Sequence, residues 1–205
     1  EEAFINEILY PYFMNMGIYV YPLICSTKRT VDKKYKGGVV DYNKIKKELI
    51  LICRQHTNEF VTSMFDYYAL PSNTPNINCS DSNLYKRIEI IEQSIENDIR
   101  MENLFFGLTL HEFEGLLFSD PNAFLEISNT SIVEKIQNIR DSALTPEHVN
   151  NSPQTAPSKR ILSLIPNYSK VLNGIAIAKK IGINKMLEEC KHFNDWITKI
   201  KNLNT

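Results

Sequence analysis

The stretch L-F-F-G-L-T-L-H-E-F-E, residues 104–114, decides how this 205-residue chain is expected to fold. Its first seven residues are mostly apolar, which is typical of a buried β-strand, and His111, Glu112 and Glu114 follow. A second segment of this kind, F-V-T-S-M-F at residues 60–65, leads directly into Asp66. Both predicted strands therefore lead into acidic side chains.

Helical and strand-like patterns alternate outward from these two strands. Apolar residues recur at helical spacing in segments 1–16, 41–55 and 84–99, and β-branched and aromatic residues mark a further strand at 18–25. This alternation predicts an α/β fold, a parallel sheet with crossover helices. Because a crossover unit opens on a strand and this chain opens on a helix, we expect a first strand upstream of residue 1.

The strand patterns stop after residue 120. Ser119 or Asp120 can cap a helix there, and Pro121 suits its first turn. Further helices are predicted at 131–141, 157–165, 168–181, 184–190 and 193–203. We therefore expect an α/β core over residues 1–120 and a helical C-terminal region packed on it over residues 121–205.

Composition and charge exclude several broad classes. The net charge of −1 gives no global attraction to nucleic acid or to a membrane surface, so a polyanion would need a local basic patch. No apolar run approaches the ~18 residues of a membrane-spanning helix. The four cysteines lie far apart, which fits neither a zinc site nor a disulfide framework and favours reduced thiols in a cytoplasm.

The acids that follow the two strands are candidate ligands of a metal ion. In open parallel sheets, ligands bind at the carboxyl ends of the strands, so Asp66 and Glu112 are expected to face one crevice, with Glu114 nearby. Clustered carboxylates favour Mg²⁺ or Mn²⁺. The alternative is that these acids cap the helices that follow. His111 fits a structural and a catalytic role equally, and Gly115 excludes an H-E-x-x-H zinc site.

Several basic or glycine-containing segments are candidates for phosphate binding. Lys159 and Arg160 fall in the first turn of a predicted helix, where cations oppose the helix dipole unless an anion is gained in return. Lys170 is a further candidate, and the pair Gly37-Gly38 could let the backbone approach a phosphate. The alternatives are solvated side-chain tips and a simple turn.

Six strings resemble one bacterial family over essentially the whole chain. They are E-E-A-F-I-N-E-I-L, K-G-G-V-V-D-Y, V-T-S-M-F-D-Y-Y-A-L-P, L-H-E-F-E-G-L-L-F-S-D-P, T-A-P-S-K-R-I and C-K-H-F-N-D-W-I. The chain resembles domain-of-unknown-function family 4276, which is similar to the Toprim fold. The resemblance implies that Asp66 is the first acid of a Toprim pair, although Tyr68 stands where the second acid is expected. It also implies a glutamate upstream of Glu1.

The residues and the resemblance together predict a Mg²⁺-dependent, Toprim-like nuclease. Asp66, Glu112 and Glu114 would hold the metal, and Lys159, Arg160 and Lys170 would bind the phosphate of a nucleic acid. The resemblance also implies an anti-phage defence or mobile-element context and an ATPase partner. The alternative is a non-catalytic, regulatory subunit of such an ATPase complex.

Overall fold

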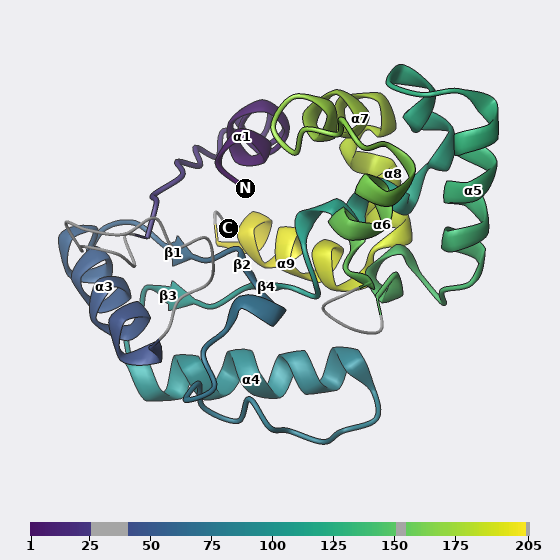
Figure 1. Ribbon diagram of the computed structural model, residues 1–205. Helices are drawn as coiled ribbons and strands as arrows, with labels where there is room; N and C mark the ends of the chain where they lie inside the picture. Colours follow the sequence, from purple (N-terminus) through teal and green to yellow (C-terminus); the bar gives the residue numbers. More distant parts are fainter. Residues whose placement is uncertain (26–40, 151–154, 204–205) are drawn as a thin grey trace, which may run out of the picture. The chain divides into compact units, whose positions relative to one another are not determined.

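The computed structural model describes residues 1–25, 41–150 and 155–203 (Figure 1). Its contacts divide the chain into two compact units. We call Glu1–Leu23 together with Leu110–Thr205 the helical unit, and Ile24–Thr109 the strand unit. Within the described residues, no helix is long and apolar enough to cross a membrane.

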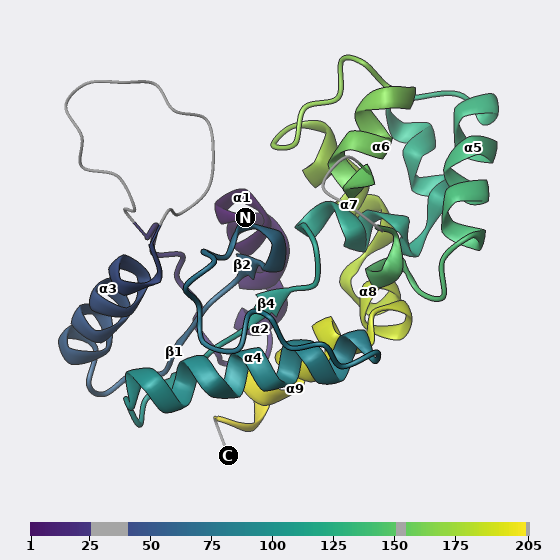
Figure 2. The same ribbon diagram turned by 60° about the horizontal axis from the view of Figure 1, so that its bottom comes forward.

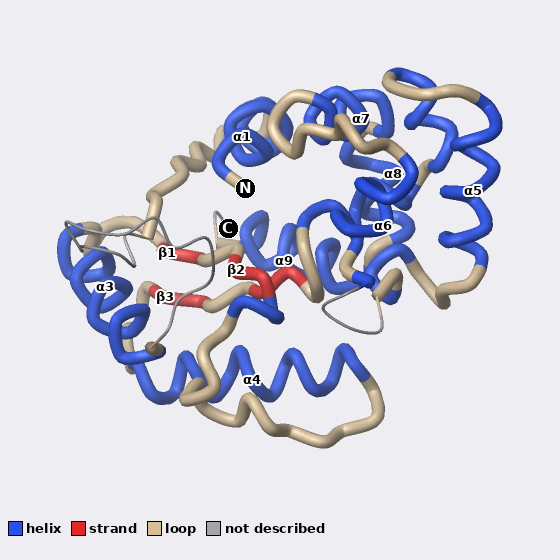
Figure 3. Tube along the Cα trace, viewed as in Figure 1, coloured by secondary structure: helices blue, strands red, loops and turns tan. Residues whose placement is uncertain are grey.

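The strand unit contains two short pairs of parallel strands, drawn in red in Figure 3. Strand β1 (Val61–Thr62) pairs with β3 (Leu104–Phe105), and β2 (Phe65–Asp66) pairs with β4 (Leu108–Thr109). The 3-10 turn η2 (Tyr67–Ala69) follows β2, and α4 (Leu84–Ile99) lies in the crossover. Parallel strands joined through a helix confirm the predicted α/β class.

Side chains complete the hydrogen bonding where each predicted strand is interrupted. The Ser63 hydroxyl donates to the Gly107 carbonyl at 2.9 Å and accepts from the Gly107 N–H at 3.0 Å. Carboxylates of α4 take two more backbone donors: Glu96 accepts from Phe106 N at 2.7 Å and Glu92 from Leu108 N at 2.8 Å. These bonds satisfy buried backbone groups that a continuous ladder would otherwise pair.

Two helices accompany the strands in this unit (Figure 2). Helix α3 (Tyr42–Gln55) has Asp41 as its N-cap, whose carboxylate accepts a hydrogen bond from Asn43 N. Helix α4 buries the isoleucine stripe that its spacing predicts, and it ends at Arg100 in the left-handed region, with φ of 56°. Both helices confirm the sequence expectation closely.

The helical unit is built from short helices that come from both ends of the chain. They are α1 (Glu2–Phe4), η1 (Ile5–Leu9), α2 (Tyr10–Met14), η3 (Phe113–Ser119), η4 (Pro121–Glu126), α5 (Thr130–Asp141), η5 (Pro146–His148), α6 (Pro157–Leu164), α7 (Asn173–Ile181), α8 (Ile183–Glu189) and α9 (Lys191–Asn202). Phe4 of α1 joins the two ends, because its ring lies 5.5 Å from that of Phe113 and 6.2 Å from that of Phe193.

The N-terminal helix is interrupted near Pro11, as predicted. A π-helical turn, η1, precedes α2, which holds Pro11 in its first turn. Proline has no N–H to donate, so the regular hydrogen-bond pattern cannot run through it. Gly17, with φ of 74°, ends the helix: Gly17 N bonds Met14 O and Ile18 N bonds Phe13 O, a Schellman motif.

Two expected elements differ in the structure. Residues 18–25 are not a strand, and Tyr19 and Tyr21 are 62% and 70% exposed. A strand needs a hydrogen-bonded neighbour, and Pro22 offers no N–H. The helix expected from residue 168 begins only at Asn173, whose side chain instead accepts from Ser169 N at 2.7 Å. That bond favours a turn before the helix.

Candidate functional site

An ion pair between a fully buried carboxylate and a partly exposed lysine lies in the helical unit. Glu114, in η3, is fully buried, and the ammonium of Lys170 lies 3.1 Å from its Oε2. The same ammonium lies 3.0 Å from Oε1 of Glu1 and 5.1 Å from the ring centroid of Phe113. Lys170 therefore connects two carboxylates and an aromatic face from segments far apart in the sequence.

Burial dominates the protonation of Glu114. Desolvation raises the pKa of this carboxyl to about 7, Lys170 opposes the rise, and the charge of Glu112 adds to it. The ion pair is therefore too weak to offset the loss of water around the carboxylate. A carboxyl that changes its charge near neutral pH is a common feature of functional sites.

Tyr168 brings a buried hydroxyl to the same cluster. The residue is 8% exposed, and its hydroxyl has no hydrogen-bond partner among the described residues. Burial, followed by the charges of Glu114 and Glu112, raises the pKa of the phenol. At Gly174, a Cβ atom would lie 2.7 Å from the Tyr168 oxygen and 3.0 Å from a ring carbon of Phe113. A larger residue at 174 would therefore displace the phenol.

Glu112 binds the start of α6. Its Oε2 accepts a hydrogen bond from Ser158 N at 2.9 Å, so a carboxylate lies where the helix dipole favours negative charge. The phosphate that we expected beside Lys159 and Arg160 would compete with Glu112 for this donor. Lys159 is exposed, and Arg160 donates from Nε to the Thr155 carbonyl at 2.9 Å.

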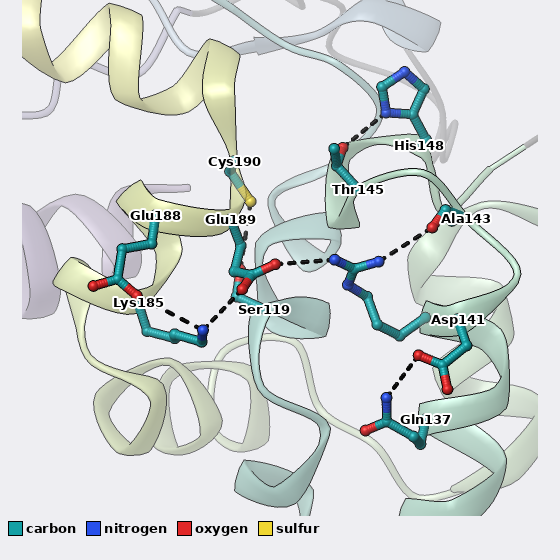
Figure 4. Close-up of polar contacts among 11 residues, drawn as sticks. Ser119, Gln137, Asp141, Ala143, Thr145, His148, Lys185, Glu188, Glu189 and Cys190 are labelled. Atoms are coloured by element: carbon teal, nitrogen blue, oxygen red, sulfur yellow. Dashed lines mark hydrogen bonds and ion pairs between the residues drawn. The ribbon is translucent and has the colours of Figure 1, made fainter.

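His111 is buried and close to a second histidine. Burial, with a smaller effect of His148, lowers the pKa of His111 to about 4. Burial also lowers the pKa of His148, whose Nδ1 lies 2.7 Å from the Thr145 hydroxyl (Figure 4). His111 is therefore a neutral imidazole at physiological pH, which weakens its case as a cationic group.

In the view that shows His148, polar contacts join several helices (Figure 4). Arg140 of α5 donates to Glu189 of α8 at 2.9 Å and to the Ala143 carbonyl at 3.1 Å. Both acceptor residues are labelled in Figure 4. In the same view, the Ser119 hydroxyl lies 3.4 Å from the Cys190 thiol. These contacts join segments of the helical unit that are far apart in the sequence.

Asp66 belongs to the strand unit. It ends β2 opposite Thr109 in the parallel register, and its Oδ1 accepts from the Thr109 hydroxyl at 2.7 Å. The meeting of Asp66 with Glu112 stays a prediction. Gly37 and Gly38 lie outside the residues that the structure describes.

The predicted metal ligands differ in how well they suit Mg²⁺. Among the described residues, no three His, Cys, Asp or Glu side chains gather as a metal site would require. Mg²⁺, however, is commonly held by one or two carboxylates with several waters and a substrate phosphate. Asp66 and Glu112 supply donors of this type, whereas the carboxylate of Glu114 already has Lys170 as its cation.

Three members of the cluster have no signature in the sequence. Glu1, Tyr168 and Gly174 meet Lys170, Glu114 and Phe113 only through the packing of the chain ends. No motif or spacing indicated these residues, because their partners lie more than 50 positions away in the sequence or in an irregular turn.

Comparison with known proteins gives one match. The model of the family described as Domain of unknown function (DUF4276) matches residues 1–201. No curated protein and no solved structure matches the chain significantly.

Proposed function

This chain belongs to the family Domain of unknown function (DUF4276), and we propose that it is a Mg²⁺-dependent hydrolase that cleaves phosphodiester bonds in nucleic acid. One observation carries the proposal. In the parallel register Asp66 stands opposite Thr109, and Glu112 follows Thr109 by three residues. Both carboxylates therefore come at or after the carboxyl ends of paired parallel strands, where open sheets bind their ligands.

The described residues suggest a division of roles. Asp66 and Glu112 would hold the metal, which when bound polarises a phosphoryl oxygen and activates water. Lys159, Arg160 and Lys170 would neutralise phosphate charge. Glu114 would keep the Lys170 ammonium in place through their contact of 3.1 Å. Mn²⁺ would substitute for Mg²⁺ at oxygen ligands of this kind.

A second candidate is a non-catalytic, regulatory subunit of an ATPase complex. The engagement of Glu114 with Lys170 and of Glu112 with Ser158 favours this alternative, since both carboxylates already have partners inside the protein. An ATPase partner, and an anti-phage defence or mobile-element context, rest on the family resemblance and are part of both proposals.

A cleavage assay with purified protein distinguishes the two candidates. We expect the chain to cut DNA or RNA in the presence of Mg²⁺ or Mn²⁺, and to lose at least about 100-fold in rate on Asp66→Asn or Glu112→Gln. Glutamine at 112 retains an acceptor for Ser158 N–H, so the helix cap is kept. The matched control is Glu102→Gln, which changes an exposed carboxyl in the strand unit.

Two results would contradict the hydrolase. One is cutting that persists in both variants. The other is the absence of cutting with either metal on single- and double-stranded DNA and RNA, which would favour the regulatory subunit.

A further inference from the structure

Four aromatic side chains are exposed among the described residues. Tyr19, Tyr21, Phe60 and Tyr68 are 62%, 70%, 57% and 42% exposed. Tyr19 and Tyr21 belong to the helical unit, and Phe60 and Tyr68 belong to the strand unit. Single exposed apolar residues are common on protein surfaces, so the placement of a ring says more about a ligand than its exposure does.

Tyr68 differs from the other exposed rings in its place relative to the strands. It lies two residues after Asp66, in the 3-10 turn η2 that follows β2, and therefore past the carboxyl end of a parallel strand. Phe60 directly precedes β1 and lies at the amino end of that strand. Open parallel sheets bind ligands beyond the carboxyl ends of their strands. Tyr68 is therefore the exposed ring of the strand unit that lies next to the proposed metal ligand Asp66.

Contacts within the turn keep this ring beside the acid. The Tyr67 carbonyl accepts a hydrogen bond from Leu70 N at 3.2 Å, which closes the turn. The ring of Tyr67 lies 5.7 Å from that of Tyr68, centroid to centroid, which is within the favourable range for an aromatic pair. Two residues of chain reach about 7 Å at most, so the backbone of Tyr68 cannot move far from that of Asp66.

A nucleobase is the ligand that suits an exposed tyrosine beside a phosphate-binding acid. A metal ion at Asp66 would hold a phosphate of nucleic acid, and the bases on either side of that phosphate come with it. Any base can stack on an aromatic ring, because every base has a flat π face. In a double helix the neighbouring base pairs already cover both faces of a base, so stacking on a protein side chain needs an unpaired base.

We propose that Tyr68 stacks on an unpaired base next to the phosphate that is cleaved, so that the substrate of the proposed hydrolase is single-stranded nucleic acid. This inference rests on the proposed function and adds the class of its substrate. Tyr68 binds and orients the strand and takes no part in breaking the bond. The alternative is a ring at the rim of the core that binds no ligand, and then replacing it would leave binding unchanged.

A single-stranded oligonucleotide that carries the fluorescent base 2-aminopurine tests the stacking. With Ca²⁺ in place of Mg²⁺, so that the strand stays intact, we expect the parent protein to bind it and to quench its fluorescence. Tyr68→Leu and Tyr68→Gln, which both lack a ring, should weaken binding by about 5- to 100-fold and abolish the quenching. Tyr68→Phe keeps the ring and should retain both.

The matched control is Phe60→Leu. It removes an exposed ring from the same unit, at the amino end of β1, and should bind the single strand as the parent does. The affinity for a double-stranded oligonucleotide should not change in Tyr68→Leu. Three results would overturn the proposal: parent-like affinity and quenching in Tyr68→Leu, an equal loss of affinity for double strands, and no binding of single strands by the parent.

The cleavage assay separates this inference from the proposed function. A parent protein that quenches 2-aminopurine through Tyr68 but never cuts would contradict the hydrolase and leave the stacking in place. A parent protein that cuts nucleic acid, while Tyr68→Leu binds single strands with unchanged affinity, would contradict the stacking alone.

Discussion

Glu114 shows how burial and charge compete at a single residue. Its carboxyl is fully buried beside an ammonium at 3.1 Å, yet its pKa is raised to about 7 because desolvation outweighs the ion pair. A partly exposed lysine remains hydrated and is a weaker partner than a buried one. The cluster therefore couples the charge of Glu114 to the stability of the helical unit.

Removing the ammonium should destabilise the protein in a pH-dependent way. For Lys170→Met we expect a loss of about 1–3 kcal/mol in the free energy of unfolding at pH 8, because a buried carboxylate is left unpaired. The loss should be smaller at pH 6, where Glu114 already carries a proton. Urea unfolding at the two pH values measures the difference, and an equal loss at both would contradict it.

The control for this variant is Lys179→Met. Lys179 pairs with Glu7 at 2.6 Å, but both side chains are about half exposed. Exposed ion pairs contribute little, so its free energy of unfolding should change by less than about 0.5 kcal/mol.

Replacing the carboxyl of Glu114 should change the pH profile of stability. In the folded protein the pKa of Glu114 is about 7, compared with an ordinary value of 4.5. The proton on Glu114 therefore contributes its full stabilisation below pH 4.5, and this contribution is lost as the pH rises through 7. The glutamine in Glu114→Gln cannot titrate. The free energy of unfolding of the variant, relative to that of the parent, should therefore rise by about 3 kcal/mol between pH 4.5 and 8.

Urea unfolding across that range measures this gain. Glu102→Gln, which changes an exposed carboxyl, should follow the parent profile throughout. A Glu114→Gln profile parallel to the parent would show that Glu114 titrates normally in the folded state.

At the scale of the elements, glutamates from other parts of the sequence accept hydrogen bonds from the first turns of two helices in the helical unit. Glu112 accepts from the first turn of α6, and Glu147 accepts from His192 N at 3.0 Å and Phe193 N at 2.9 Å at the start of α9. Neither helix has a side-chain cap from its own N-cap residue, Ala156 or Cys190. A carboxylate from elsewhere in the chain replaces the local cap.

Loss of the buried cap at α9 should therefore weaken the unit. We expect Glu147→Ala to lower the free energy of unfolding by about 2–3 kcal/mol, because two backbone donors lose a charged acceptor. Glu147→Gln should recover about half of that loss by keeping one acceptor. The control Glu134→Ala, an exposed position on α5, should differ little from the parent in chemical denaturation. An unchanged free energy of unfolding for Glu147→Ala would contradict the capping role.

At the scale of the whole molecule, the proposed metal site predicts a response to Mg²⁺. With Mg²⁺ at ten times its dissociation constant, binding to the folded state alone adds about 1.4 kcal/mol and raises the Tm by about 3–5 °C. Asp66→Asn and Glu112→Gln should each abolish the rise in a thermal-shift assay, and Glu102→Gln should keep it. If Mg²⁺ leaves the Tm of the parent protein unchanged, that result would argue against a resident metal.

Local patterns in the sequence were sufficient to predict the α/β class of the fold. The isoleucine stripe of α4, Pro11 and Gly17 each act through near neighbours, so these helices and helix ends followed from them. The apolar segments around β2 and β4 indicated strands, and their alternation with helices indicated parallel pairing. One exception, residues 18–25, has the composition of a strand, but a strand also needs a partner that composition cannot supply.

Only the tertiary structure decided which groups meet around Glu114. The sequence indicated Glu112, Glu114 and Lys170 separately, but the contacts with Glu1 and Tyr168 join positions from both ends of the chain. Burial, and with it the raised pKa of Glu114, is a property of the packed environment. Local sequence determines the helices because their hydrogen bonds join near neighbours, whereas strand pairing, desolvation and ion pairing depend on segments that folding brings together.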